Sequence, residues 1–268
     1  MSIDGYLSPE IYARDLLHKC NLQVTPTPLE DICKQSGIKV IYSTKPDAPG
    51  LFFIDPQNNV PHIIIKDDVP SYSRKAFTLA HEIGHCFIPG HSNKYSCSYA
   101  DLLNYTPDKL AEKQANEFAS ELLMPTKLFV PQIKKHNLSL ESFSTLSNVF
   151  QTSLQATAIK FIKNTPDVGA IIYCQNGKFV WAFKSKSFSW NIRNFLHPWT
   201  YAYDFFNSSK DLIGKPEEVN SSGWLLDTTP FDNLIEETIS MPYLKATFTL
   251  IHPAVFKTDN EDEEYLLG

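Results

Sequence analysis

The stretch FTLAHEIGH, residues 77 to 85, constrains this chain more than any other segment. Its apolar side chains recur at helical spacing, and each residue of a helix advances by roughly 100°, so His81 and His85 lie within about 40° of each other. We expect both histidines on one face, opposite the face that packs against the core. Two imidazoles one turn apart can hold a single metal ion, and Glu82 on the flank could reach a water at that ion. The five-residue pattern also occurs by chance, so alone it leaves an ordinary amphipathic helix open.

A third metal ligand would favour the metal site, and the first candidate is His91. It stands six residues after His85, which is the spacing of the last histidine in the metzincin pattern. That pattern also needs a glycine where this chain has Ile88. Without the glycine the chain cannot easily turn back toward the helix. We therefore expect His91 in a loop near the site.

The second candidate is Glu112, in the segment AEKQANEFASELLMP at residues 111 to 125. Glu112 falls in the middle of the apolar side of the predicted helix, where a carboxylate is costly unless it is paired or binds a metal. Asn116, one turn further on, is placed to hydrogen-bond a ligand. Glu117 and Glu121 fall on the other side, where solvent would account for them. A salt bridge from Glu112 to a lysine or arginine is the alternative to metal binding.

Together, FTLAHEIGH and EKQANEFASELLMP resemble the ImmA/IrrE family of zinc metallopeptidases, closely here and more loosely over residues 8 to 163. The resemblance implies a zincin-like fold in which His81, His85 and Glu112 bind Zn²⁺ and Glu82 is the catalytic acid/base. It also implies a cytoplasmic endopeptidase that cleaves a helix-turn-helix transcriptional repressor. Such cleavage would induce repressed genes in a stress response or a mobile element.

Periodicity along the rest of the chain predicts an α+β protein with a small sheet before the histidine-bearing helix. A hairpin is expected around Asn176-Gly177, which favours the type I′ turn. Helices are expected at 9–20 and 28–37, from Pro107-Asp108 to Met124-Pro125, and as a pair within 140–163 around a turn near Gln151. Strands are expected at 38–43, 51–55, 62–67 and 244–252.

The change in character after Pro166 predicts more than one domain. The residues at 1–135 would form the metallopeptidase domain, 136–165 a helix-turn-helix-like segment, 166–258 a separate sensing or docking domain, and 259–268 an acidic tail. For the third part we expect an α/β sensor-like fold of the GAF or PAS type. Its many aromatic side chains are expected in the core rather than around a ligand, since strand aromatics more often pack than bind.

Composition excludes several classes of protein. The chain of 268 residues is 43% hydrophobic and can bury a sizeable core, but no stretch approaches the roughly 18 apolar residues of a membrane span, so no membrane partner is expected. Five cysteines, without a C-x-x-C pair, favour a reducing cytoplasm over a disulfide framework. The net charge of −6 and the lack of a basic region argue against nucleic acid as the main ligand.

Two other functions stay open. The helix pair within 140–163 could make the protein a DNA-binding regulator, although Lys160 and Lys163 are the only basic groups on its second helix, which favours a structural pair. Alternatively, the zinc site could serve a partner-binding module with little hydrolysis, but such a scaffold would not need Glu82. The candidates for stabilising an oxyanion are the loop residues Tyr95, Tyr99 and Tyr105.

Overall fold

The computed structural model describes residues 7–69, 71–91, 94–97, 110–208 and 211–254, with 94–97 described by their backbone. Its contacts divide the chain into two compact units. Unit 1 comprises the residues up to Lys135 together with Phe143–Thr157, and unit 2 comprises His136–Ser142 together with the residues from Ala158 onward. Each unit contains helices and one sheet, which confirms the α+β class. No helix in the described part of the chain is long and apolar enough to cross a membrane.

The sheet of unit 1 has four strands in the order β1-β3-β2-β4. Its first three strands are β1 (Lys39–Ser43), β2 (Gly50–Ile54) and β3 (Pro61–Lys66), close to the predicted ranges, because these runs are rich in β-branched and aromatic residues. β1 is parallel to β3, whereas β2 is antiparallel to both of its neighbours. The fourth strand, β4 (Lys94–Cys97), was not predicted.

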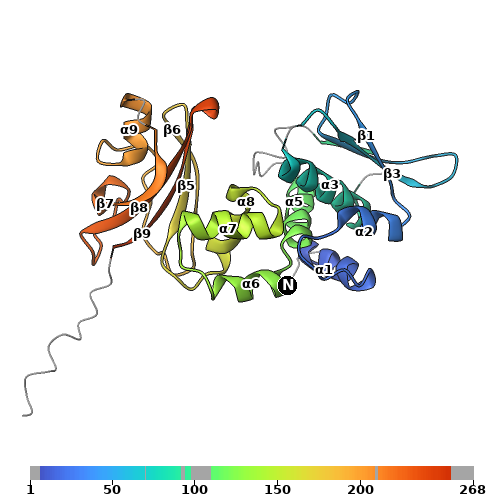
Figure 1. Cartoon of the computed structure of the whole chain (residues 1–268), viewed down its shortest axis with the longest axis horizontal. Helices are drawn as coiled ribbons and strands as arrows, with labels where there is room; N and C mark the ends of the chain where they lie inside the picture. The colour runs from blue at the N-terminus through green and yellow to red at the C-terminus, as the bar shows by residue number, and fades with distance from the viewer. Residues whose placement is uncertain (1–6, 70, 92–93, 98–109, 209–210, 255–268) are drawn as a thin grey trace, which may run out of the picture. The chain divides into compact units, whose positions relative to one another are not determined.

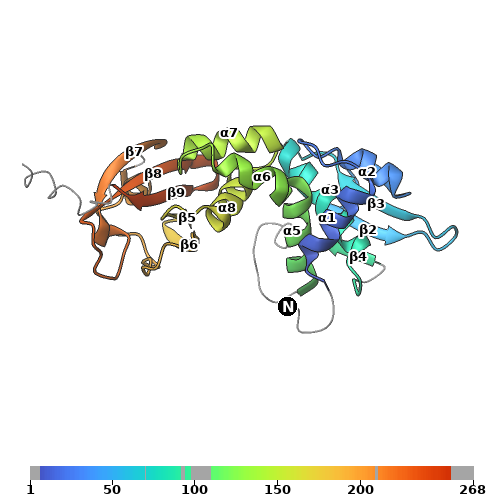
Figure 2. The same cartoon turned by 90° about the horizontal axis from the view of Figure 1, so that it is seen from below.

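Helices cover this sheet and form the core of unit 1 with it (Figure 1, Figure 2). The helix that carries both histidines, α3 (Tyr72–Phe87), packs on β2 and β3 and also contacts α1 (Pro9–Lys19), α2 (Leu29–Gln35) and α5 (Leu110–Leu123). α3 is therefore the central element of the unit. Among the buried apolar residues of this core are Leu16, Leu17, Ile32, Phe52, Ile63, Leu79, Ile83, Phe118 and Leu122.

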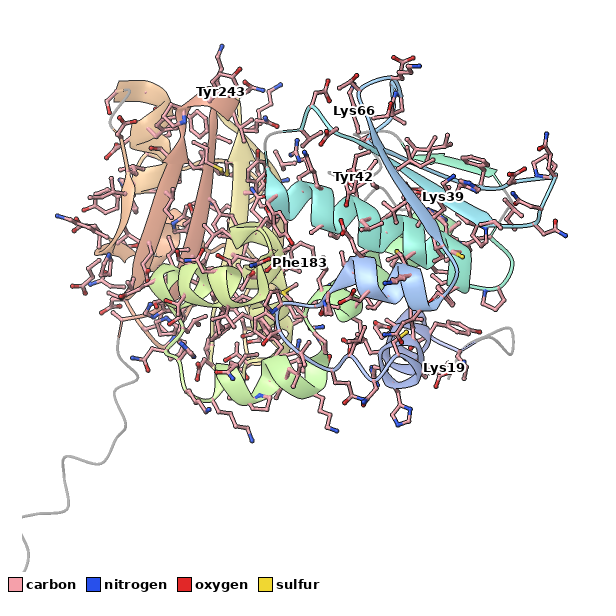
Figure 3. All side chains as sticks on the ribbon, turned by 45° about the vertical axis from the view of Figure 1, so that its right-hand side comes forward. Lys19, Lys39, Tyr42, Lys66, Phe183 and Tyr243 are labelled. Carbon is pink, nitrogen blue, oxygen red and sulfur yellow. The ribbon has the colours of Figure 1, made fainter. Side chains whose placement is uncertain are left out.

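Local interactions explain where the helices of unit 1 begin and end. The side chain of Ser71 accepts a hydrogen bond from the backbone N–H of Arg74 and caps the N-terminus of α3. Gly37 follows α2 with a φ of 71°, a left-handed conformation that glycine adopts without strain and that ends a helix. Tyr42, labelled in Figure 3, donates a hydrogen bond of 2.8 Å to Glu30 and so ties β1 to α2.

The predicted helix pair consists of α7 (Leu140–Phe150) and α8 (Leu154–Asn164), and both helices contribute residues to both units. They meet at Gln151, whose φ of 54° reverses the chain where the sequence predicted a turn. An additional helix, α6 (Thr126–Ile133), was not predicted; its Phe129 packs against Phe150 with ring centroids 5.1 Å apart.

Unit 2 contains a five-stranded antiparallel sheet in the order β6-β5-β9-β8-β7. The expected hairpin joins its first two strands, and Asn176 and Gly177 have φ values of 52° and 74°, as a type I′ turn requires. The last predicted strand corresponds to β9. The five strands are β5 (Ala170–Gln175), β6 (Lys178–Lys184), β7 (Ile213–Asn220), β8 (Asn233–Met241) and β9 (Ala246–Pro253).

The buried carboxylate of Glu236 organises the core of unit 2. It accepts four hydrogen bonds, from the backbone N–H groups of Tyr201 and Ala202, from the indole of Trp224 and from the hydroxyl of Thr238. Burial raises the pKa of Glu236, and these donors act in the opposite direction. The carboxylate thereby joins β8 to the first turn of the short helix α9 (Tyr201–Ser208).

Candidate metal centre

Close packing of α3 on α5 creates the site. A side chain at Gly84 would place its Cβ 3.2 Å from Phe118 Cδ1 and 3.3 Å from Ala115 Cα, so a glycine lets the two helices approach at this point. Ala115 and Phe118 are completely buried. The glycine of HEIGH thus helps to bring the first turn of α5 up to the histidines.

Three side chains from these helices converge, namely His81, His85 and Glu112, each offering one ligand atom within 4.8 Å of the others. The Nε2 atoms of the two histidines are 3.0 Å apart. Oε2 of Glu112 lies 3.3 Å from His81 Nε2, and Oε1 lies 3.8 Å from His85 Nε2. Two nitrogens and a carboxylate are therefore directed at one point.

These separations fit a zinc-sized ion. Ligands at 2.0–2.1 Å in a tetrahedral arrangement are separated from one another by roughly 3.3 Å. The 3.0, 3.3 and 3.8 Å found here bracket that value. The donor set of two imidazoles and one carboxylate is that of open catalytic zinc sites, which keep a fourth position for water or substrate.

The sequence predicted that the histidine face of α3 would be turned away from the core. This prediction was wrong. His81 and Glu82 are fully buried and His85 is 2% exposed, because α5 covers this face. Helical periodicity identifies the shared face but not what packs on it. Burial, followed by the neighbouring His81 and His91, lowers the pKa of His85 to about 2, so its imidazole is neutral and able to bind a metal.

Asn116 lies where the sequence predicted, one turn after Glu112 on the same helix. Its Oδ1 accepts a hydrogen bond of 2.9 Å from His81 Nδ1. A proton on Nδ1 leaves the lone pair of Nε2 directed toward His85 and Glu112.

His91 lies in the segment after α3, on the outer side of His85. Its Nδ1 is 2.8 Å from Nδ1 of His85, and its Nε2 is 3.1 Å from Oε1 of Gln114 on α5. Both ring nitrogens of His91 thus contact His85 Nδ1 and Gln114, and neither is directed at the point where His81, His85 and Glu112 converge. Burial lowers the pKa of His91, while Gln114 and Glu112 act in the opposite direction.

Gly50, at the start of β2, belongs to the site, although no pattern in the sequence indicates this. A Cβ at this position would stand well inside 3.0 Å of the Glu82 carboxylate and 2.7 Å from Thr78 Cγ2. The missing side chain leaves the space that the Glu82 carboxylate occupies. Only a glycine in the strand facing α3 could have indicated this, and many strand glycines have other roles.

The prediction that solvent accounts for Glu121 was wrong. This side chain is 2% exposed, and it accepts hydrogen bonds from the backbone N–H and the hydroxyl of Thr126. It also pairs with Arg14 at 3.1 Å. α1 packs on this side of α5, so the face that local periodicity assigned to solvent is covered, and Glu121 binds the first residue of α6 instead.

The oxyanion candidates are not placed by the structure. Tyr99 and Tyr105 lie outside the described residues, as does the acidic tail at 259–268. Tyr95 belongs to β4, of which only the backbone is described.

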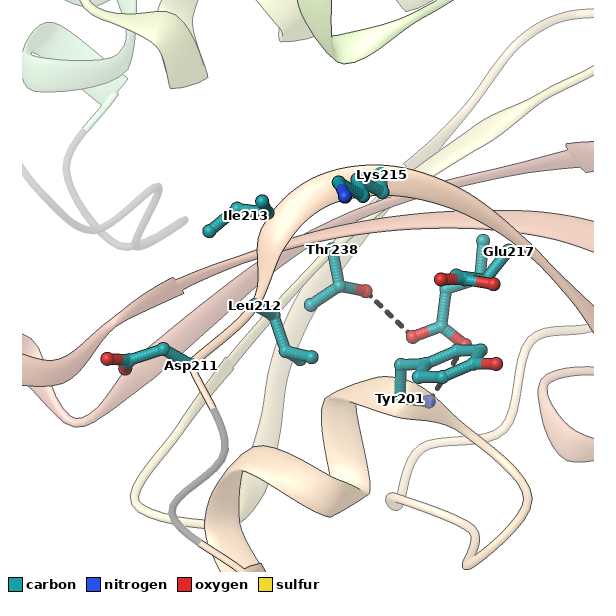
Figure 4. Close-up of a pocket in the computed structure, with 8 residues that line it drawn as sticks. Tyr201, Asp211, Leu212, Ile213, Lys215, Glu217 and Thr238 are labelled. Carbon is teal, nitrogen blue, oxygen red and sulfur yellow. Dashed lines mark hydrogen bonds between the residues drawn. The ribbon is translucent and has the colours of Figure 1, made fainter.

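Unit 2 has a cavity of about 220 Å³, shown in Figure 4. Its lining combines apolar and polar side chains and includes Glu236, whose carboxylate already has four donors from the protein. Of the aromatic residues expected in the core, Trp224 and Phe188 are buried there, whereas Phe195 and Trp199 are exposed. The cavity is lined by Tyr201, Asp211, Leu212, Ile213, Lys215, Glu217, Glu236 and Thr238.

Comparisons with known proteins agree with this geometry. Residues 33–161 match the family of the IrrE N-terminal-like domain, a peptidase family. The radiation response metalloprotease IrrE of Deinococcus radiodurans is 24% identical over 124 residues, which is 46% of this chain and 37% of that protein. The chain thus matches little more than a third of that relative's length.

A solved structure titled Mycobacterium tuberculosis transcriptional regulator is similar in fold. It has a TM-score of 0.57 and 12% identity, covering 91% of this chain and 75% of the other. The matched residues 33–161 contain α3, α5 and the converging His81, His85 and Glu112. Over these residues, the chain is similar to the ImmA/IrrE family of metallopeptidases, as the sequence predicted.

Proposed function

We propose that the chain is a zinc-dependent endopeptidase whose ligands are His81, His85 and Glu112 and whose acid/base is Glu82. The observation that carries the proposal is the buried convergence of the three ligand atoms, with Glu82 fully buried on the same helix. The two histidines and one glutamate favour zinc over magnesium or calcium, which prefer oxygen ligands.

A zinc ion at this position would polarise a peptide carbonyl and lower the pKa of a water at the site to roughly 7. Glu82 would accept a proton from that water as it attacks the carbonyl carbon. It would then pass the proton to the departing amine, so one carboxylate serves as base and then as acid. Asn116 keeps His81 in the required tautomer, and Gly50 leaves room for the Glu82 carboxylate. Burial of the site strengthens each of these electrostatic interactions.

For the substrate we propose a helix-turn-helix transcriptional repressor, whose cleavage would induce genes of a stress response or mobile element in the cytoplasm. The support is the family that residues 33–161 match and the name of the Deinococcus relative, a radiation response metalloprotease. Unit 2 would be the sensing or docking part, of GAF or PAS type. Its separate sheet and core support a separate role.

The second candidate function is a DNA-binding or partner-binding regulator with little hydrolytic activity. It is favoured by the similar fold of the protein titled transcriptional regulator. The second helix of the pair, α8, supports it poorly. Thr157 and Lys160 are buried, and the ammonium of Lys163 lies 5.1 Å from the ring centroid of Phe183, so three of the polar groups that could contact DNA are already engaged or covered.

The test is metal analysis of the purified chain, followed by incubation with the repressor encoded beside its gene. We expect one zinc per chain and a defined cleavage. Glu82→Gln should retain the metal and abolish cleavage, because it removes the acid/base without removing a ligand. A chain that binds zinc and the repressor's operator DNA but never cleaves the repressor would favour the regulator.

A further inference from the structure

One ligand histidine, His85, is followed by a hydrogen-bonded chain that leads away from the metal centre. His85 Nδ1 meets His91 Nδ1 at 2.8 Å, and His91 Nε2 meets Gln114 Oε1 at 3.1 Å. His91 comes from the segment after α3 and Gln114 from α5, so the chain connects the two elements that supply the ligands.

We propose that His91 and Gln114 are positioning residues that hold His85 in the tautomer that binds metal, an inference that rests on the proposed metal centre. Between two neutral imidazoles that face each other through Nδ1, one must donate and the other accept. Gln114 sets the direction, because its carbonyl oxygen accepts and so requires the proton of His91 on Nε2. His91 Nδ1 is then the acceptor, and His85 Nδ1 carries the donated proton.

The direction of the hydrogen bond between His85 and His91 matters because His85 has only one further ring nitrogen, Nε2, with which to bind a metal. With its proton on Nδ1, His85 presents the lone pair of Nε2 to the point shared with His81 and Glu112. With the opposite direction, His85 Nε2 would carry a proton and could not bind a metal until it lost that proton. The hydrogen bonds through His91 and Gln114 therefore favour the metal-binding tautomer of His85 before a metal ion binds.

The same arrangement occurs at the other histidine, where Asn116 accepts from His81 Nδ1 at 2.9 Å. Each ligand histidine thus has an outer partner supplied by α5, directly for His81 and through His91 for His85. Loss of such a partner typically weakens metal affinity by roughly 10–100-fold. A ligand itself contributes far more, because without it the centre is incomplete.

The experiment measures the affinity of the full-length chain for Zn²⁺ by competition with a chelator. Two substitutions at one position separate hydrogen bonding from packing. The ring centroids of His85 and His91 lie 4.9 Å apart. His91→Phe keeps a ring at this place but removes the Nδ1 acceptor. His91→Asn loses the ring but keeps an oxygen near the place of Nδ1. We expect a loss of affinity of about 10–100-fold for His91→Phe and of less than about 3-fold for His91→Asn.

Substitutions at Gln114 test the donor–acceptor direction of these hydrogen bonds. Gln114→Leu should weaken Zn²⁺ binding by several-fold, and Gln114→Glu, which still accepts from His91 Nε2, should not. The matched control is His18→Ala, since His18 is an exposed histidine on α1. Two-dimensional ¹H–¹⁵N spectra of the histidine side chains add a direct readout, because the metal-free wild type should show a protonated Nδ1 on His85 and metal-free His91→Phe should not.

If His91→Phe and Gln114→Leu bind Zn²⁺ as tightly as the wild type, the positioning role is wrong. If His91→Phe abolishes binding to the same extent as His81→Ala, then His91 is a ligand and the proposal is also wrong. If His81→Ala itself leaves binding unchanged, the metal centre fails rather than the positioning chain. Thermal unfolding of the metal-free variants identifies any that do not fold, in which case the Gln114 pair carries the test.

Discussion

Replacement of Gly50 by alanine should separate catalysis from metal binding more sharply than any other single change. The new Cβ would stand 2.9 Å from Glu82 Cγ and closer still to its Oε1, whereas ordinary contacts begin at 3.4 Å. The carboxylate is the far end of a flexible side chain, so it can give way by about 1 Å. A misplacement of that size can lower the rate by about 100-fold, equivalent to about 2.7 kcal/mol of transition-state stabilisation.

The assay for Gly50→Ala follows kcat for repressor cleavage and the affinity for Zn²⁺ in the same preparation. We expect kcat to fall by about 100-fold and Zn²⁺ affinity to stay within about 3-fold, since the added methyl is directed at Glu82 and not at a ligand. The Cβ would also lie 2.7 Å from Thr78 Cγ2. Adding Thr78→Ser removes that second clash, so the double variant should regain stability but not activity.

Two results would refute this reasoning. An unchanged kcat in Gly50→Ala would mean that the position of the Glu82 carboxylate is not limiting. Recovery of kcat in the double variant would mean that the clash with Thr78, and not the displaced carboxylate, had lowered the rate.

The remaining predictions concern other parts of the chain. Glu112→Ala should weaken Zn²⁺ binding by more than 100-fold in a metal titration, and an unchanged affinity would remove Glu112 from the ligands. A chain truncated after Asn164 should still fold and bind zinc while its cleavage of the repressor changes; unaltered cleavage would exclude a regulatory role for unit 2, and failure to fold would contradict the domain division. Glu236→Leu should lower the free energy of unfolding by about 2–4 kcal/mol in urea, more than Glu236→Gln, because the buried donors lose their acceptor. The metal-free chain should lose stability as the pH falls below 6.5, by up to about 1.4 kcal/mol per pH unit, because the unfolded chain protonates His85 there and the folded chain does so only near pH 2. In His85→Asn that pH slope should shrink.

Features of the fold that depend on neighbours along the chain could be predicted from the sequence. Periodicity placed His81 and His85 on one helix face and Glu112 on the apolar side of the next helix, and Asn176-Gly177 located the hairpin of unit 2. These are consequences of backbone geometry and turn conformation, and they act over a few residues. β4, α6 and α9 were not predicted individually, since short segments carry little periodic signal. The longer strands β7 and β8 were not predicted either.

The packing of one element on another was decided only by the tertiary structure. Periodicity divides a helix into faces, but it cannot say that α5 covers the histidines or that α1 covers Glu121. The space that Gly50 leaves for Glu82 and the contact of His91 with Gln114 depend on segments 23 or more residues apart in the sequence. Such contacts arise from close packing of the whole unit, in which each side chain is accommodated by neighbours that local patterns do not specify.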